Sequence, residues 1–272
     1  RHIGQDVDRH GQEQERRGQQ RSDTSAHLYR SSIPSLQPYT SPTYPSFDLS
    51  IMDQRRMDAW LAEFSGYERA SRLPAFELIH LPGDHTSGGR AGMRTPRAYM
   101  ADNDLALGRL IDAVSHSPFW KNTVVFVLED DAQDGPDHVD SHRSVMLVVS
   151  AWNRGGVVHR FVNTTDVLAT MEEILGLGTL SQFDHFGRPL RDIWSTSPDL
   201  RPYSALVPAT ALTELNAARG ASARASARLN WSHADLIDDD TFNHILWRIV
   251  KGPAIPYPVE RRVTMQEMLS AR

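Results

Sequence analysis

The sequence contains no cysteine among its 272 residues. This absence excludes disulfide bonds, thiolate metal sites and a cysteine nucleophile. Any metal ion that the protein binds must therefore be held by His, Asp or Glu side chains.

Positive charge and long apolar runs are also scarce. Lys and Arg number 29 against 34 Asp and Glu, which gives a formal net charge of -5. A protein that binds nucleic acid or an anionic membrane surface needs a basic face, so we expect no nucleic-acid partner. No apolar run approaches the roughly 20 residues of a membrane-spanning helix, so we expect no membrane span.

Composition divides the chain into three segments. Residues 1–43 form a polar lead-in with several prolines, which we expect to be disordered or extended. Residues 44–198 carry the regularly spaced apolar runs of a folded core. Residues 199–272 are predicted to be a linker, rich in Ala, Arg and Ser over 209–228, followed by a C-terminal helix over 231–250.

Three helices are predicted in the core. Asp53 is expected to cap the first, which ends near Gly66 and has apolar side chains at helical spacing: Met57, Trp60, Leu61 and Phe64. The second is predicted over 95–115, because a proline favours the first turn of a helix. The third is predicted over 165–175, with a glycine directly behind it as a stop signal.

Three apolar runs, at 76–81, 123–128 and 145–150, are predicted to be strands. The run at 123–128 is typical of a central strand buried on both faces. Strands that alternate with helices predict an α/β layered fold with a mostly parallel sheet flanked by helices. In such a sheet the ligand site lies beyond the carboxyl ends of the strands.

Acidic residues and histidines gather at these strand ends. One group follows the first predicted strand, a second follows the strand at 123–128, and a third precedes the strand at 145–150. A mixture of carboxylate and imidazole ligands suits Zn, Mn or Fe. The candidate metal-ligating residues are Asp84, His85, Asp130, Asp131, His138 and His142.

Some of these residues also have a structural interpretation. Asp84 stands beside a Pro-Gly pair, so an alternative interpretation makes it a turn residue. Asp130 and Asp131 differ, because carboxylates at the end of a buried strand carry a large desolvation cost unless a partner offsets it. For the three arginines at 90, 94 and 97, a solvated basic loop is favoured over a phosphate-binding cluster.

Three motifs in a fixed order resemble a known family. They are Leu-Pro-Gly-Asp-His-Thr-Ser-Gly at 81–88, Ala-Asp-Asn-Asp-Leu-Ala-Leu-Gly at 101–108, and Glu-Asp-Asp through Pro-Asp-His-Val-Asp at 129–140. They resemble the bacterial phosphoesterases, which include phosphocholine-type phospholipases C, acid phosphatases and phosphoesterases attached to β-propeller repeats. The resemblance covers roughly residues 44–195 and is weaker over 235–252.

This resemblance implies an alkaline-phosphatase-like fold and a metal-dependent phosphoesterase that hydrolyses a phosphate mono- or diester. The ligand groups of the wider superfamily correspond to His85, to Asp130 with Asp131, and to His142. In the phospholipase C branch, the Asp-His-Val motif matches His138 instead, so both histidines stay candidates. The implied catalytic residues are Asp130, Asp131 and His138, and the implied cofactors are divalent metal ions, with Zn, Mn, Fe, Mg and Ca left open.

The nucleophile of the family lies upstream of the matching region, and nothing before Tyr44 resembles it. We therefore expect the C-terminal part of a catalytic domain, incomplete at the N-terminus. The alternative is a non-catalytic remnant, or a fragment that a partner complements. A sulfatase-like or phosphonate-cleaving enzyme of the same superfamily is a further alternative.

Partners and location follow from the same resemblance. The implied partners are a phosphate ester substrate and, in a longer protein, a β-propeller or the other half of the catalytic domain. Family members often act outside the cytoplasm, so the resemblance suggests an extracytoplasmic location.

Overall fold

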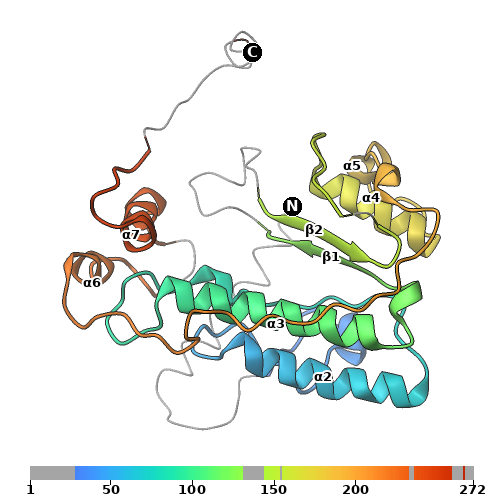
Figure 1. Cartoon of the computed structure of the whole chain (residues 1–272), viewed down its shortest axis with the longest axis horizontal. Coiled ribbons are helices and arrows are strands. Elements are labelled where there is room, and N and C mark those ends of the chain that lie inside the picture. Colours follow the sequence, from blue (N-terminus) through green and yellow to red (C-terminus); the bar gives the residue numbers. More distant parts are fainter. Residues whose placement is uncertain (1–27, 131–143, 154, 233–235, 259–265, 267–272) are drawn as a thin grey trace. The chain divides into compact units, whose positions relative to one another are not determined.

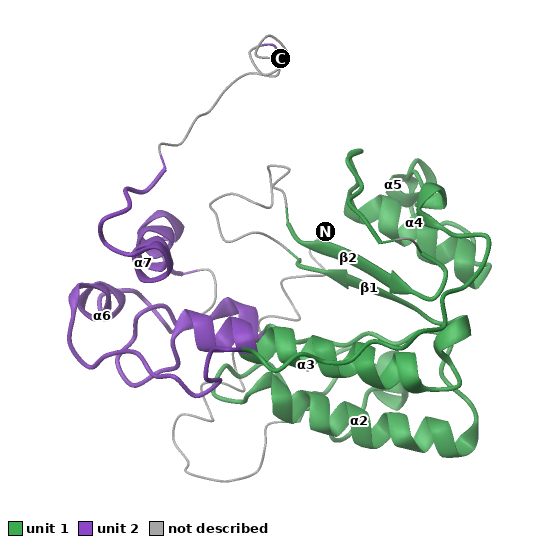
Figure 2. Cartoon of the chain, viewed as in Figure 1, with its two compact units in different colours: residues 1–82, 102–132, 142–208 green, residues 83–101, 133–141, 209–272 purple. Residues whose placement is uncertain are grey.

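The computed structural model describes residues 28–130, 144–153, 155–232, 236–258 and 266. The chain divides into two compact units (Figure 2). The first comprises residues 1–82, 102–132 and 142–208, and the second comprises residues 83–101, 133–141 and 209–272. The boundaries predicted at 43/44 and 198/199 stay predictions.

The first unit is built on two long helices, α2 (Asp53–Ala70) and α3 (Pro96–His116), the latter from Asp102 onward. They run alongside each other in Figure 1. One apolar face of each helix enters the same core. The buried core residues are Met57, Trp60, Phe64, Ala106, Leu110, Ile111, Val114, Trp120 and Ala151. The short helices η1 (Pro34–Tyr39) and η3 (Trp120–Asn122) belong to the same unit.

Both ends of α2 differ from the prediction. Met52, not Asp53, is the N-cap residue, and its side chain makes no capping bond. The helix continues past Gly66 to Ala70 and ends at Ser71, which adopts a left-handed conformation with φ 50°. A single glycine in a helix costs only about 1 kcal/mol, so the packing of the apolar face outweighs it.

The sheet consists of two strands among the described residues, β1 (Val124–Leu128) and β2 (Met146–Ser150). They pair antiparallel, with Val124 opposite Ser150 and Leu128 opposite Met146. The fold is therefore mixed α and β, but the prediction of parallel pairing is wrong for these strands. A continuous apolar run identifies a strand without giving the direction of its neighbour. No residue of β1 is fully buried, so the prediction of burial on both faces is also wrong.

The prediction of a strand at 76–81 is wrong as well. These residues have no assigned secondary structure, although their side chains alternate as in a strand. Ile79 and Leu81 pack against the core, whereas Phe76 and Leu78 are 58% and 87% exposed. Local alternation sets the direction of the side chains, but a strand also needs a neighbour with which to exchange backbone hydrogen bonds.

The remaining helices of the first unit follow β2. Helix α4 (Thr164–Leu175) confirms the helix predicted at 165–175. It begins with a capping box between Asn163 and Asp166 and ends at Gly176, which has φ 67°. Helix α5 (Gln182–His185) and the 3-10 helix η4 (Arg191–Ile193) come next, and α4 contacts α5.

The second unit contains α6 (Ala221–Ser226), α7 (Asp239–Lys251) and the loop that precedes α3. Helix α7 confirms the C-terminal part of the helix predicted over 231–250, but it begins at Asp239 and not at Trp231. It buries Phe242 and Ile245. The ring of Phe242 meets Trp231 edge to face at 5.7 Å. In the described part of the chain, no helix combines the length and apolarity needed to cross a membrane.

Candidate functional site

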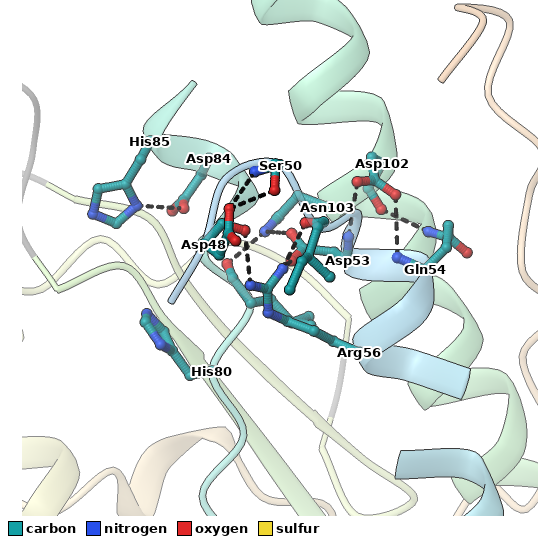
Figure 3. Close-up of polar contacts among 12 residues, drawn as sticks. Asp48, Ser50, Asp53, Gln54, Arg56, His80, Asp84, His85, Asp102 and Asn103 are labelled. Atoms are coloured by element: carbon teal, nitrogen blue, oxygen red, sulfur yellow. Dashed lines mark hydrogen bonds and ion pairs between the residues drawn. The ribbon is translucent and has the colours of Figure 1, made fainter. Parts of the chain in front are cut away.

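Asp84 and His85 form a side-chain pair at the end of the short 3-10 helix η2 (Pro82–His85). The Nδ1 atom of His85 lies 3.2 Å from Oδ1 of Asp84 (Figure 3). The side chain of His85 is 41% exposed and that of Asp84 is 30% exposed, so both can be reached from solvent. A carboxylate at one ring nitrogen fixes the orientation and tautomer of an imidazole, as second-shell carboxylates do for metal-binding histidines.

Thr86, directly after this pair, has an unusual backbone conformation. Its φ is 53°, in the left-handed region that a β-branched residue rarely adopts. The residue is 6% exposed, and its Oγ1 accepts the N–H of Gly88 at 3.2 Å. Such conformations cost about 1–3 kcal/mol, persist where the surroundings enforce them, and cluster at functional sites.

Close packing within the second unit holds the loop at 86–94. The Gly89 N–H donates to the buried Ser226 Oγ at 2.9 Å. A Cβ atom on Gly88 would lie 2.7 Å from the Phe242 ring, and Gly88 has φ 53°, so both space and conformation require glycine there. Ser87 is 2% exposed, and its hydroxyl lies 3.1 Å from the Tyr99 hydroxyl.

The side-chain amide of Asn216 contacts three backbone carbonyls of the same loop. The Nδ2 group of Asn216 lies 2.9 Å from the Gly88 carbonyl and 3.0 Å from the carbonyls of Arg90 and Arg94. The Asn216 N–H also donates to the Met93 carbonyl at 2.8 Å. The Asp84–His85 pair therefore adjoins a loop that is fixed along most of its length.

The arginines of this loop pack against aromatic rings. The guanidinium of Arg94 lies 4.0 Å from the Tyr99 ring centre, and that of Arg90 lies 4.9 Å from the Trp231 ring centre. Arg94 is only 9% exposed, so the interpretation as a solvated arginine is wrong for this residue. Arg97 donates to the Val250 carbonyl at 2.9 Å.

Asp130 is exposed and lies just beyond β1 in the first unit. Its neighbour Glu129 closes the open end of the strand pair: its N–H donates to the Val145 carbonyl at 3.1 Å, and its Oε2 accepts the Val145 N–H at 3.2 Å. Asp131, His138 and His142 lie outside the described residues.

The structure therefore brings together two of the predicted site residues, Asp84 and His85, in the second unit. Within the ranges that the structure describes, no three His, Asp or Glu side chains form a group that would hold a metal ion.

A buried network around Asp102 was missed by the sequence analysis. The Asp102 carboxylate accepts the N–H of Asp53 at 2.8 Å and that of Gln54 at 3.2 Å, and so caps α2 from a distance of about 50 residues along the chain (Figure 3). Asn103 donates to Asp53 Oδ2 at 3.1 Å and to the Leu81 carbonyl at 2.8 Å. This network holds the chain three residues before Asp84.

Arg56 completes the network with a fully buried guanidinium. It pairs with Asp53 Oδ1 at 3.1 Å and donates to the carbonyls of Ser46, Asp48 and Ile51. Its charge is thus both paired and hydrogen-bonded, as a buried charge must be. The sequence feature that could have indicated this network is the Asp-Asn pair at 102–103, within the motif at 101–108.

Comparisons with the models of known protein families, with curated proteins and with solved structures found no match.

Proposed function

We propose that this chain is a metal-dependent phosphoesterase with an alkaline-phosphatase-like layered fold, related to the bacterial phosphoesterases. Its substrate is a phosphate mono- or diester. The observation that carries the proposal is the pairing of Asp84 with His85 directly before a fixed loop with a left-handed Thr86. An oriented imidazole beside a strained backbone is typical of a functional site.

The donor chemistry of the candidate residues fits a divalent metal ion. Carboxylate and imidazole donors without thiolates suit Zn, Mn or Fe, and carboxylates alone suit Mg or Ca. His85 would bind through its ring, with Asp84 setting its orientation, and Asp130 would bind through its exposed carboxylate together with Asp131 and one of His138 and His142. When bound, a pair of such ions supplies charge stabilisation for phosphoryl transfer.

The chain's own residues supply position and charge in this proposal. Asp84 holds the His85 ring in one orientation, and the contacts of Asn216 and Ser226 with the loop at 88–94 limit its movement. A displacement of about 1 Å at a reacting centre can cost about 100-fold in rate, so a fixed loop supports the chemistry.

The test combines metal content with turnover. We expect about one or more Zn, Mn or Fe ions per purified chain by elemental mass spectrometry, and metal-dependent hydrolysis of p-nitrophenyl phosphate or bis-p-nitrophenyl phosphate. The variant His85→Ala should lose both properties. A matched control is His116→Ala, since His116 pairs with Asp112 at 3.0 Å on the surface of α3 and has no role in the proposed site.

Each other outcome has a definite meaning. Metal that binds without turnover would favour the non-catalytic alternative. Cleavage of p-nitrophenyl sulfate in preference to both phosphate esters would favour a sulfatase-like enzyme. A folded chain without metal and without turnover would overturn the proposal.

A further inference from the structure

We propose that the carboxyl groups of Glu172 and Asp184 form a binding site for one hydrated divalent cation of the Mg²⁺ and Ca²⁺ class. This site lies in the first unit, where α4 packs against α5, and it is separate from the candidate phosphoesterase residues.

Both residues are buried, and their carboxyl groups are hydrogen-bonded to each other. Glu172 is 6% exposed and Asp184 is 3% exposed. The Oε1 atom of Glu172 is buried and accepts no hydrogen bond from the part of the chain that the structure describes. A buried oxygen without a partner has lost its hydration with no compensating contact, and a bound cation would offset this loss.

Asp184 keeps its negative charge in this environment. It accepts the Ser181 hydroxyl and, at 2.6 Å, the Leu180 N–H. These bonds, the Ser181 hydroxyl first, hold the pKa of Asp184 well below its usual range. Burial and contact with Asp184 raise the pKa of Glu172 above its usual value. Two carboxyl groups this close need a proton or a metal ion between them.

Glu172 and Asp184 belong to the lining of a cavity that has room for water. The cavity measures about 180 Å³. A water molecule occupies about 30 Å³ in the liquid, so the cavity can hold a cation with several of its waters. Mg²⁺ typically binds proteins through one or two carboxylates and keeps the rest of its hydration shell. The polar residues that line the cavity are Glu172, Glu173, Thr179, Asp184, His185 and Arg191.

The charges around the cavity leave the pair negative. Arg191 forms its ion pair with Glu173, so its guanidinium is engaged beside the cavity. His185 is exposed and meets the Phe186 ring edge to face at 4.9 Å. The unoffset charge therefore lies on Asp184 and Glu172, where a small divalent cation would meet it.

The experiment measures the melting temperature of the full chain with MgCl₂ or CaCl₂, against NaCl at equal ionic strength. All proteins carry Asp130→Asn and Asp131→Asn, which remove two of the candidate ligands of the phosphoesterase site, and the comparison with Glu172→Gln separates any remaining contribution of that site. We expect a rise of about 3 °C or more at saturating cation, and a calorimetric titration with about one ion per chain. Glu172→Gln should abolish both signals, whereas Glu173→Gln, the matched neighbour at the rim, should keep them.

Glu172→Gln is nearly isosteric, and its amide can donate to Asp184, so we expect this variant to fold. If neither MgCl₂ nor CaCl₂ changed the melting temperature, the proposal would be overturned, and the two carboxyl groups would share only a proton. An equal response of Glu172→Gln and its parent would overturn it too. Neither result bears on the proposed phosphoesterase activity, which is measured with Asp130 and Asp131 intact.

Discussion

The carboxylate of Asp102 accepts the backbone N–H of Asp53 at 2.8 Å, so a side chain of α3 caps the N-terminus of α2. The first N–H groups of a helix have no partner within the helix, and a carboxylate there also meets the positive end of the helix dipole. This contact joins the two helices that form the core of the first unit.

Asp102→Ala should lower the free energy of unfolding by about 2–4 kcal/mol. It removes the acceptor for the N–H groups of Asp53 and Gln54 in a site where Asp102 is fully buried. Asp102→Asn keeps one acceptor oxygen and should lose less. Urea unfolding followed by circular dichroism measures both changes.

The matched control is Asp58→Ala on α2, the helix that Asp102 caps. Asp58 is 52% exposed and pairs with Arg109 of α3 at 2.7 Å, so this variant should lose no more than about 1 kcal/mol. Equal losses in Asp58→Ala and Asp102→Ala would contradict the capping role.

Ser71→Gly should raise the free energy of unfolding by about 0.5–1 kcal/mol. Ser71 ends α2 with φ 50° and ψ 35°, a conformation that glycine adopts without steric cost. Ser65→Gly in the interior of the same helix should lower it by about 1 kcal/mol. Thermal and urea unfolding must therefore show opposite signs for the two variants, and a loss of stability in Ser71→Gly would count against the left-handed end.

Local chemistry explains which elements the sequence predicted well. The start of α3 at Pro96 and the end of α4 at Gly176 follow from the properties of those residues, and both were predicted within one or two residues. The end of α2 at Ser71 was missed because serine carries no preference for a left-handed conformation. The direction of β2 depends on its pairing with β1, which no local pattern records.

The features of the candidate site likewise fall into those that the sequence predicts and those that it does not. Asp84 and His85 are neighbours in sequence, so their contact could be expected from the motif alone. Three other features depend on contacts with residues far along the chain. They are the backbone conformation of Thr86, the burial of Arg94, and the contacts of the Asn216 amide with the loop carbonyls. Such features need the structure, because the residue types by themselves favour other states.

Glu77 should make stability fall as pH rises. Its burial, opposed by the hydrogen bond from Trp60 Nε1 at 3.0 Å, raises its pKa above the ordinary 4.5. The folded chain therefore holds a proton that the unfolded chain has lost, and unfolding becomes easier from about pH 4.5 upward. We expect this loss of stability to total less than about 1 kcal/mol, since Glu77 is only half-buried. Glu77→Gln should remove it.

Urea midpoints of both proteins at pH 4.5 and pH 8 test this expectation. The variant should be more stable relative to its parent at pH 8 than at pH 4.5. A constant difference between the two proteins would show that Glu77 does not titrate in this range.

Asn216→Ala should loosen the loop at 86–94. The variant removes the amide that lies 2.9–3.0 Å from three loop carbonyls. We expect a loss of about 1–3 kcal/mol and faster amide hydrogen exchange across the loop, with α2 unchanged. Asn230→Ala is the control, because Asn230 binds only its neighbour Ser232 in the contacts described. Unaltered amide exchange across the loop would contradict the role of Asn216 in holding it.

Asp84→Asn tests whether the Asp84–His85 contact positions the imidazole for metal. An amide at Nδ1 offers a weaker acceptor and a competing donor, so the ring loses its fixed orientation. We expect metal affinity and turnover to fall about 10- to 100-fold, less than in His85→Ala, which removes the ligand itself. Asp112→Asn changes the comparable surface pair with His116 and should alter neither property. If Asp84→Asn bound metal as tightly as its parent, the contact would be a turn feature of η2, and the ligand role of His85 would have to stand without it.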